Sequence, residues 1–314
     1  MKALVTGAAG FIGSTLCDRL IASGADVTGI DCFTDHYPRP LKERNLSGLR
    51  QARGFTFVER AIADADLNDL LQGVTHVFHL AAQAGVRKSW GRDFGVYTVN
   101  NVNATQILLE GCVGKPIERV VYASSSSIYG DEVALPMRED ARPQPVSPYG
   151  VTKLAAEQLC HLYHVNYSVP TVSLRYFTVY GPRQRPDMGF SRFFDAVLRD
   201  APITMFGDGR QTRDFTFVAD AVSAMVQAAT RGKPGGVYNI GGGSRVELLD
   251  VFELIRLVTG RPLTIERVEA QRGDMRDTYA DTTRARADLG FAPTVTLEQG
   301  LRAQYEWITS IDAK

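Results

Sequence analysis

Cysteine is scarce in this chain of 314 residues, and the four that it has are scattered. They form no C-x-x-C pair and show none of the histidine spacings of a zinc site. This pattern excludes a disulfide framework and gives no reason to expect a bound metal. We expect buried thiols that are kept reduced in the cytoplasm. The four residues are Cys17, Cys32, Cys112 and Cys160.

An excess of one charge is also missing, because Lys+Arg and Asp+Glu both total 35. Nucleic-acid-binding proteins usually carry a basic excess or a basic stripe, so no nucleic-acid partner is expected. No apolar run approaches the roughly 20 residues of a membrane span, so no membrane association is expected. Met1 and Lys2 lead directly into an apolar strand rather than into a signal peptide. The composition predicts a cytoplasmic enzyme or binding protein.

Short β-branched runs alternate with helical patterns along the chain. Such alternation predicts right-handed crossovers and a parallel sheet with helices on both faces. The expected strands are 3–6, 26–30, 56–59, 76–80, 119–123, 169–175 and 237–240. The expected helices are 12–23, 67–71, 99–111, 148–165, 190–198, 218–230, 248–258 and 297–308. We therefore expect an α/β protein with a Rossmann-type doubly wound parallel sheet and a smaller C-terminal α/β substrate-binding domain.

The alternation loosens after about residue 177, where loops such as 181–188 and 205–214 dominate. We expect residues 1–176 to form the nucleotide-binding domain, with a return segment at about 215–242. Residues 177–314 would mainly form the region that holds a second ligand. Ligands of such sheets bind beyond the carboxyl ends of the strands, which is where the motifs described next are found.

The first expected strand leads into a glycine-rich loop, G-A-A-G-F-I-G, with Gly7, Gly10 and Gly13. Glycine permits the tight turn, the close approach of backbone to a pyrophosphate and the packing of helix on strand. The free N–H groups of the following helix favour an anion. Asp31 ends the second strand, where a carboxylate holds a ribose 2′-hydroxyl and repels a 2′-phosphate, so NAD is preferred to NADP. The alternative is an ordinary glycine loop followed by a surface aspartate.

Tyr149 and Lys153 form a Y-x-x-x-K pattern at the start of an expected helix. Residues four apart lie on one helix face, and a nearby ammonium lowers the pKa of a tyrosine so that it can act as a base. Alone, this pattern usually marks a solvated helix face. Here it follows the glycine loop and a run of four serines, 124–127, after another strand. A hydroxyl from that run can bridge a substrate oxygen and the tyrosine.

With these motifs the sequence resembles the extended short-chain dehydrogenase/reductase family of NAD-dependent nucleotide-sugar epimerases and dehydratases. The resemblance covers essentially the whole chain. It includes T-G-A-A-G-F-I-G, H-L-A-A at 79–82, Y-G-V-T-K, R-Y-F-T-V-Y-G-P at 175–182 and R-D-F at 213–215. It implies that NAD stays bound, that a tyrosine takes a hydroxyl proton while hydride passes to NAD, and that hydride returns to the other face of the keto sugar.

The resemblance implies a catalytic set of Ser125, Tyr149 and Lys153, with Ser125 placed by registering the serine run on Tyr129 and Gly130. The implied NAD contacts are Gly7, Gly10, Phe11, Ile12, Gly13, Asp31, Ile62, Leu80, Ala81, Ala82, Asn100, Tyr149, Lys153, Tyr176 and Val179. The implied substrate contacts are Arg87, Ser125, Ser126, Ser127, Tyr149, Thr178, Arg185, Arg213 and Asp274. At Arg60-Ala61-Ile62 the chain departs from the usual Gly-Asp-Ile, so the adenine contact of that aspartate is missing or passes to Asp64.

Two positions discriminate among branches of the family. Dehydratases and decarboxylases place acidic residues where this chain has Ser126 and Ser127, so simple inversion of a carbon is favoured. The segment 177–188, with Thr178 and Arg185, is most similar to the UDP-glucuronate 4-epimerase branch. We therefore expect a UDP-sugar substrate, UDP-glucuronate, converted to UDP-galacturonate, with Arg185 and the serines holding the carboxylate. Arg185 can instead lie on the surface or contact the diphosphate.

Three alternatives stay open at this point. A UDP-glucose or UDP-N-acetylhexosamine 4-epimerase would share the same redox site, and a non-catalytic NAD-binding regulator would share the fold. The helices 99–111 and 148–165 resemble those that form a homodimer interface in the family, although their apolar residues can equally be core. His79 is expected to fill the sheet rather than to catalyse.

Overall fold

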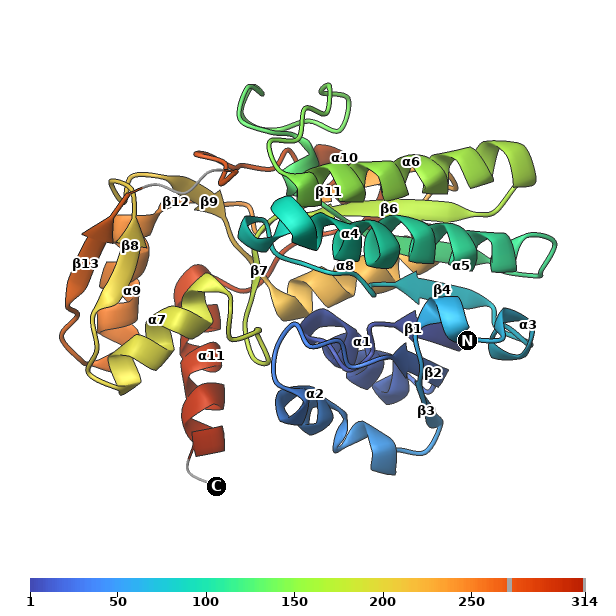
Figure 1. Ribbon diagram of the computed structural model, residues 1–314, viewed down its shortest axis with the longest axis horizontal. Coiled ribbons are helices and arrows are strands. Elements are labelled where there is room, and N and C mark those ends of the chain that lie inside the picture. Colours follow the sequence, from blue (N-terminus) through green and yellow to red (C-terminus); the bar gives the residue numbers. More distant parts are fainter. Residues whose placement is uncertain (270–272, 313–314) are drawn as a thin grey trace.

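A sheet of seven parallel strands forms the centre of the computed structural model, which describes residues 1–269 and 273–312 (Figure 1). The strand order is β11-β6-β5-β4-β1-β2-β3, and each neighbouring pair is parallel. The strands are β1 (Lys2–Thr6), β2 (Asp26–Asp31), β3 (Phe55–Glu59), β4 (His76–His79), β5 (Arg119–Ser125), β6 (Thr171–Tyr176) and β11 (Val237–Ile240). The predicted α/β fold with a doubly wound parallel sheet is confirmed. The order reverses between β1 and β4, which marks the crevice where such sheets bind ligands.

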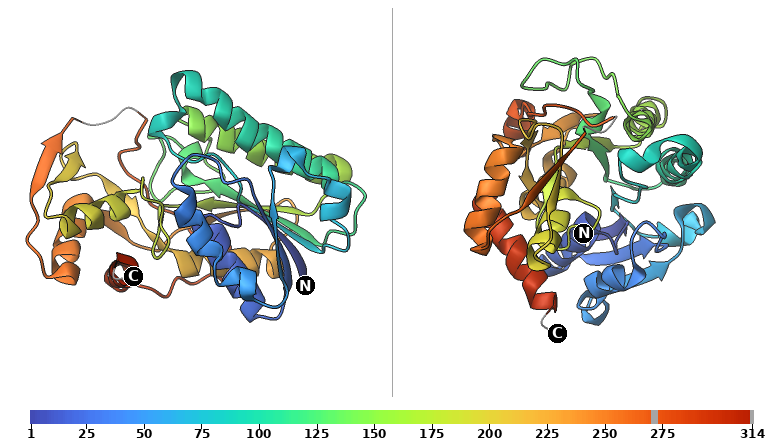
Figure 2. Two further views of the ribbon diagram at one scale, coloured as in Figure 1. Left: turned by 60° about the horizontal axis from the view of Figure 1, so that its bottom comes forward. Right: turned by 60° about the vertical axis from the view of Figure 1, so that its left-hand side comes forward.

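Helices cover both faces of the sheet, because alternate strand residues point to opposite sides. Ala3 and Val5 belong to one hydrophobic cluster, whereas Leu4 belongs to the other. The first face is covered by α1 (Phe11–Ala22), α2 (Arg39–Leu46), α8 (Val218–Arg231) and α10 (Thr283–Leu289). The second face is covered by α3 (Leu67–Leu70), α5 (Ala104–Cys112) and α6 (Pro148–Tyr167). Figure 2 shows α5 and α6 side by side on this second face.

The C-terminal part builds a separate hydrophobic cluster to one side of the sheet (Figures 1 and 2). Its helices are α7 (Gly189–Leu198), α9 (Leu248–Thr259) and α11 (Leu297–Asp312). Its strands pair as β8 (Ile203–Phe206) with β13 (Ile265–Val268), and β9 (Thr212–Asp214) with β12 (Arg245–Glu247). Two further short strands, β7 (Val179–Tyr180) and β10 (Thr216–Phe217), connect it to the sheet.

Most predicted elements lie within two residues of the observed ones, but some predictions were wrong. The loop predicted at 205–214 contains β9, and α2 and α10 were not foreseen. The helix predicted at 99–111 begins with α4 (Phe94–Tyr97) and passes through a π-helical turn, Thr98–Asn103, before α5. Because α2 buries Lys42, Asn45 and Leu46, it shows no apolar periodicity in the sequence. The short strands β7, β9, β10 and β12, of two or three residues, likewise show too little alternation to be recognised.

Cys17, Cys112 and Cys160 are buried free thiols, as predicted, but Cys32 is exposed. The prediction was wrong for Cys32 because this residue directly follows β2, where the chain leaves the sheet. Among the helices in the described part of the chain, none has the length and apolarity that crossing a membrane requires.

Candidate active site

The glycine loop between β1 and α1 is so tightly packed that side chains would not fit. Gly7 has a φ of 71°, and a Cβ there would lie 2.9 Å from the Ala81 nitrogen. A Cβ on Gly13 would overlap the Gly7 carbonyl oxygen. The first turn of α1 contains no acidic residue that would compete for its N–H groups. The loop therefore fits a pyrophosphate group held at the start of a helix.

Asp31 stands at the carboxyl end of β2, beside this loop. Its carboxylate accepts hydrogen bonds from the Ala9 nitrogen at 3.1 Å and the Phe33 nitrogen at 2.9 Å. Burial raises the pKa of Asp31, and the two backbone N–H groups oppose this shift. A carboxylate has about four acceptor sites, so two remain for ribose hydroxyls.

Helix α6 brings the predicted Ser125, Tyr149 and Lys153 together. Its N-cap, Ser147, accepts a hydrogen bond from the Gly150 nitrogen at 3.1 Å, which fixes the first helical turn. Gly150 packs so closely on the serine run that a Cβ would collide with the Ser127 carbonyl oxygen. Burial raises the pKa of Tyr149, whereas its hydrogen bond with Ser125 and the charge of the Arg185 guanidinium lower it.

Lys153 lies one turn after Tyr149 and is only 4% exposed. Its Nζ is 4.4 Å from the centre of the Tyr122 ring, a distance typical of a cation–π contact. Burial lowers the pKa of Lys153 to about 7, although Cys160 and Glu157 act in the opposite direction. Lys153 thus lies one helical turn from Tyr149 in a buried site that disfavours its charge.

A buried line of hydrogen bonds fixes the orientation of the His79 ring. Thr6 Oγ1 accepts from the Leu80 and Ala81 nitrogens, so its own proton goes to His79 Nδ1 at 2.8 Å. His79 Nε2 then carries the ring proton and donates to Thr105 Oγ1 at 2.9 Å. Burial lowers the pKa of His79 to about 3, and the Lys153 charge adds to this shift. His79 therefore joins the glycine loop to α5.

Asn101, next to the predicted Asn100, is a buried residue that the sequence patterns did not single out. It lies in the π-helical turn, is 1% exposed, and donates from Nδ2 to Thr152 Oγ1 at 2.9 Å. Its Oδ1 accepts from the Gln83 nitrogen at 2.7 Å. The predicted Asn100 is half-buried and donates to the Val96 carbonyl oxygen at 2.8 Å. Nothing in the sequence distinguishes the two neighbouring asparagines, because the extra residue of the π turn sets which one points inward.

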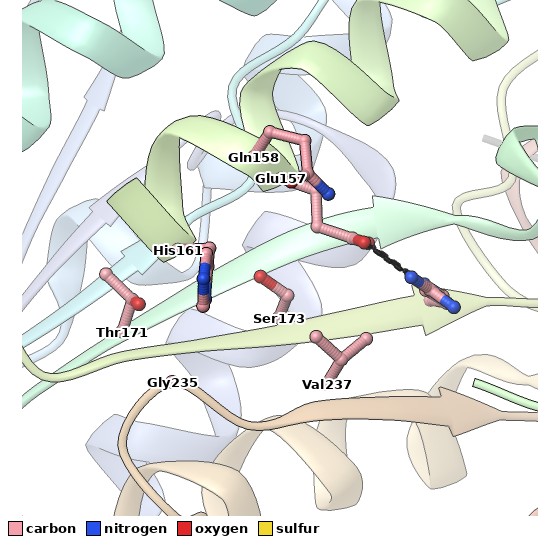
Figure 3. A pocket seen from close by; sticks show the side chains of 8 residues that line it. Glu157, Gln158, His161, Thr171, Ser173, Gly235 and Val237 are labelled. Carbon is pink, nitrogen blue, oxygen red and sulfur yellow. Dashed lines mark hydrogen bonds and ion pairs between the residues drawn. The ribbon is translucent and has the colours of Figure 1, made fainter. Parts of the chain in front are cut away.

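Behind the serine run, a buried ion pair ties α6 to the sheet. Arg175 Nη2 is 2.7 Å from Glu157 Oε1, and Ser124 Oγ donates to Glu157 Oε2 at 2.6 Å. This pair borders a cavity of about 240 Å³ between α6, β6 and β11. Figure 3 shows Glu157 reaching from α6 toward β6 at this cavity. Ser125, Tyr149 and Lys153 are not among the residues that line it, so it is distinct from the candidate site.

The predicted substrate residues fall into two groups. One group is Arg87, Arg213 and Asp274. Arg87 Nη2 is 2.6 Å from Asp274 Oδ2. Burial lowers the pKa of Arg213, and the negative charge of Asp274 opposes this shift. Arg185 lies instead near Tyr149 and pairs with Asp187. Its side chain is 19% exposed.

The other predicted residues lie at the carboxyl ends of the strands or just beyond them. Leu80, Ala81 and Ala82 follow β4, Tyr176 ends β6, and Val179 begins β7 after the half-buried Thr178. Phe11 and Ile12 begin α1. Ser126 is buried after β5, and Ser127 donates its backbone N–H to Ser125 Oγ at 3.1 Å. Ile62 is the one buried residue of a short 3₁₀ turn after β3.

Known proteins resemble the chain over its full length. The family described as "NAD dependent epimerase/dehydratase family" matches residues 3–241. An uncharacterised UDP-glucose epimerase of Bacillus subtilis (strain 168), YtcB, is 44% identical over 99% of this chain and 99% of its own. A UDP-glucuronate 4-epimerase of Thermodesulfobacterium geofontis is 35% identical over 97% of this chain and 95% of its own. The crystal structure of UDP-glucuronic acid 4-epimerase from Bacillus cereus with UDP-glucuronic acid and NAD is 46% identical, with a TM-score of 0.96 over 99% of this chain and 100% of that one.

Proposed function

Because the chain belongs to the NAD dependent epimerase/dehydratase family, we propose that it is an NAD-dependent isomerase that inverts C4 of UDP-glucuronate to give UDP-galacturonate. The observation that carries this proposal is the position of Arg185. Its side chain is largely buried, and its positive charge lowers the pKa of Tyr149. An arginine beside the reacting tyrosine suits a substrate that carries its own carboxylate.

The residues present fit the cofactor. Gly7, Gly10 and Gly13 leave room for the pyrophosphate at the start of α1, and Asp31 has acceptor sites for the adenosine ribose. Lys153 would hold the nicotinamide ribose. Bound NAD would supply the acceptor for a hydride from C4 of the sugar and, later, the donor that returns it. A 4-keto sugar therefore exists only transiently, between two redox steps.

Tyr149 is the proton carrier in this proposal. Its phenolate takes the proton of the C4 hydroxyl, and it returns that proton after the keto sugar has rotated to present its other face. The Ser125 hydroxyl lowers the pKa of Tyr149 and can hold the same sugar oxygen. The Lys153 ammonium, one helical turn away, favours the phenolate. No carboxylate base follows Ser125, which agrees with inversion rather than dehydration.

The carboxylate makes the intermediate vulnerable, because a 4-keto glucuronate is a β-keto acid. It loses CO2 when its C5–carboxylate bond stands perpendicular to the carbonyl plane. An epimerase must therefore hold the carboxylate near that plane with polar groups. We propose that Arg185, Ser126, Ser127 and Thr178 do this, while Arg87, Arg213 and Asp274 hold the nucleotide diphosphate and ribose.

We infer further that residues 1–176 and a return segment at about 215–242 hold NAD, and that residues 177–314 mainly hold the nucleotide sugar. The pairing of β11 with β6 and the packing of α8 in the same core as α1 support this division. We also propose a cytoplasmic homodimer formed through α5 and α6. Exposed apolar side chains along α6 support it: Val151 at 47%, Leu162 at 46% and Val165 at 62%.

The test is incubation of the purified protein with a panel of UDP-sugars, followed by NMR analysis of the products. We expect UDP-galacturonate from UDP-glucuronate without stoichiometric added NAD. The YtcB relative favours UDP-glucose 4-epimerisation as a second candidate function. If UDP-glucose is epimerised well and UDP-glucuronate is not, the substrate assignment fails, while the fold and redox chemistry stand.

A further inference from the structure

Arg185 and Asp187 form a two-point ion pair on the loop that precedes α7. Arg185 Nε is 3.0 Å from Asp187 Oδ1, and Nη2 is 3.0 Å from Asp187 Oδ2. A guanidinium has five N–H donors in a rigid plane, and this pair engages its Nε–Nη2 edge. The adjoining Nη1–Nη2 edge is left for a second carboxylate. Asp187 and a substrate carboxylate can therefore bind Arg185 at the same time.

The buried His36 lies behind Asp187, at an ion-pair distance but beyond hydrogen-bond reach. His36 Nε2 is 3.6 Å from Asp187 Oδ2, and its side chain is 8% exposed. His36 Nδ1 lies 2.8 Å from Gln83 Nε2, which is a donor, so the ring proton belongs on Nε2 and faces Asp187. Burial would raise the pKa of Asp187, but His36 and Arg185 hold it below its usual range. Asp187 is thus a fixed anion.

Gln83 is itself fixed, because its backbone exchanges two hydrogen bonds with the buried Asn101 side chain. The Gln83 nitrogen donates to Asn101 Oδ1 at 2.7 Å, and Asn101 Nδ2 donates to the Gln83 carbonyl oxygen at 3.0 Å. A hydrogen-bonded chain therefore runs from the π-helical turn through Gln83 to His36, whose Nε2 faces the Asp187 carboxylate at 3.6 Å. A free arginine side chain can adopt many rotamers. The contacts behind Asp187 therefore help to hold the Arg185 guanidinium in one orientation.

We propose that Asp187, backed by His36, is a positioning residue that turns the free edge of Arg185 toward the sugar carboxylate and so protects the keto intermediate from losing CO2. This inference rests on the proposed function. In the unwanted reaction the C5–carboxylate bond breaks and its electron pair forms the enolate of the C4 ketone. CO2 leaves, and C5 takes a proton from water to give a 4-keto pentose.

The test compares Asp187→Asn with the unaltered protein, using UDP-glucuronate and measuring CO2 and UDP-galacturonate together. An asparagine is uncharged and has one acceptor oxygen, so it cannot form the two parallel bonds that the Asp187 oxygens accept from Nε and Nη2. Because a misplacement of about 1 Å can cost on the order of 100-fold, we expect kcat/KM to fall about tenfold. We also expect the ratio of CO2 to UDP-galacturonate to rise about tenfold, since that ratio reports orientation rather than binding.

Asp18→Asn is the matched control. It weakens another aspartate–arginine pair, in which Arg183 of the same loop places Nη1 2.7 Å from Oδ2 of Asp18 on α1. We expect the product ratio to stay unchanged in this variant. An unchanged ratio in Asp187→Asn, or an equal rise in both variants, would overturn the inference and leave the proposed function intact. If the unaltered protein makes no UDP-galacturonate, the proposed function fails, and the inference fails with it.

Discussion

Lys153 places its ammonium group 4.4 Å from the centre of the Tyr122 ring, beneath the second face of the sheet. The Tyr122 ring attracts the ammonium only weakly. The Lys153 side chain is almost completely buried, and this burial lowers its pKa to about 7. The unaltered protein therefore carries a lysine whose charge costs stability in the absence of ligand. A buried lysine that destabilises the fold in this way is typical of an active site, where the side chain takes part in catalysis or ligand binding.

This cost has a defined pH dependence. An unfolded lysine titrates near 10.4, so between about pH 7 and pH 10 the unfolded chain binds more protons than the folded one. The penalty is complete below pH 7 and vanishes above the unfolded pKa. We expect Lys153→Met to raise the free energy of unfolding by a few kcal/mol at pH 7, with the gain shrinking toward pH 10. Denaturant melts of the NAD-free protein measure it, with Lys88→Met at an exposed lysine as the control. A gain independent of pH would contradict the account.

Tyr149→Phe tests the proton carrier. The variant keeps the ring but loses the hydroxyl, so NAD and UDP-sugar should still bind. Turnover should fall by about 10²–10⁴-fold, the usual contribution of proton transfer. Steady-state kinetics with calorimetric binding on the same sample separates the two effects. Tyr167→Phe, at an exposed residue near the end of α6, should change neither. Near-normal turnover in Tyr149→Phe would remove this tyrosine from the mechanism.

Asp31 should set the preference for NAD. Its charge repels a 2′-phosphate and accepts strongly from ribose hydroxyls, and hydrogen bonds to charged groups contribute about 1.5–3 kcal/mol. Asp31→Asn should therefore weaken NAD binding by roughly 10- to 100-fold. It should also reduce the difference in affinity between NAD and NADP. Calorimetry with both cofactors measures this, and Asp35→Asn in the exposed part of the same loop is the control. Tighter binding of NADP by the unaltered protein would show that the assignment of Asp31 is wrong.

The sequence predicts the parts of this site that depend on neighbours in the chain. The glycine loop, the end of β2 and the pair Tyr149 and Lys153 each have a local pattern. The first two lie at strand ends and the pair lies in the first turns of α6, as expected. The link from His36 to Asp187 has no such pattern, because the two residues are far apart in sequence and meet only through the fold. The ion pair between Glu157 and Arg175 is hidden for the same reason.

Arg185→Gln tests the carboxylate contact itself. Only the acidic sugar loses an ion pair, which is worth on the order of 1.5–3 kcal/mol. We expect kcat/KM for UDP-glucuronate to fall by roughly 10- to 100-fold, and far less for a neutral UDP-hexose. The exposed Arg192→Gln on α7 serves as the control. Equal losses on both sugars would indicate that Arg185 contacts the diphosphate instead.

The central claim is that C4 of UDP-glucuronate is inverted by removing its hydrogen and returning the same hydrogen to the other face. The most direct measurement uses UDP-glucuronate carrying deuterium at C4, with NMR and mass analysis of the product and parallel detection of CO2. We expect UDP-galacturonate that keeps the deuterium at C4, with little CO2. Loss of the deuterium to solvent, or a UDP-pentose with CO2 as the main products, would contradict the account.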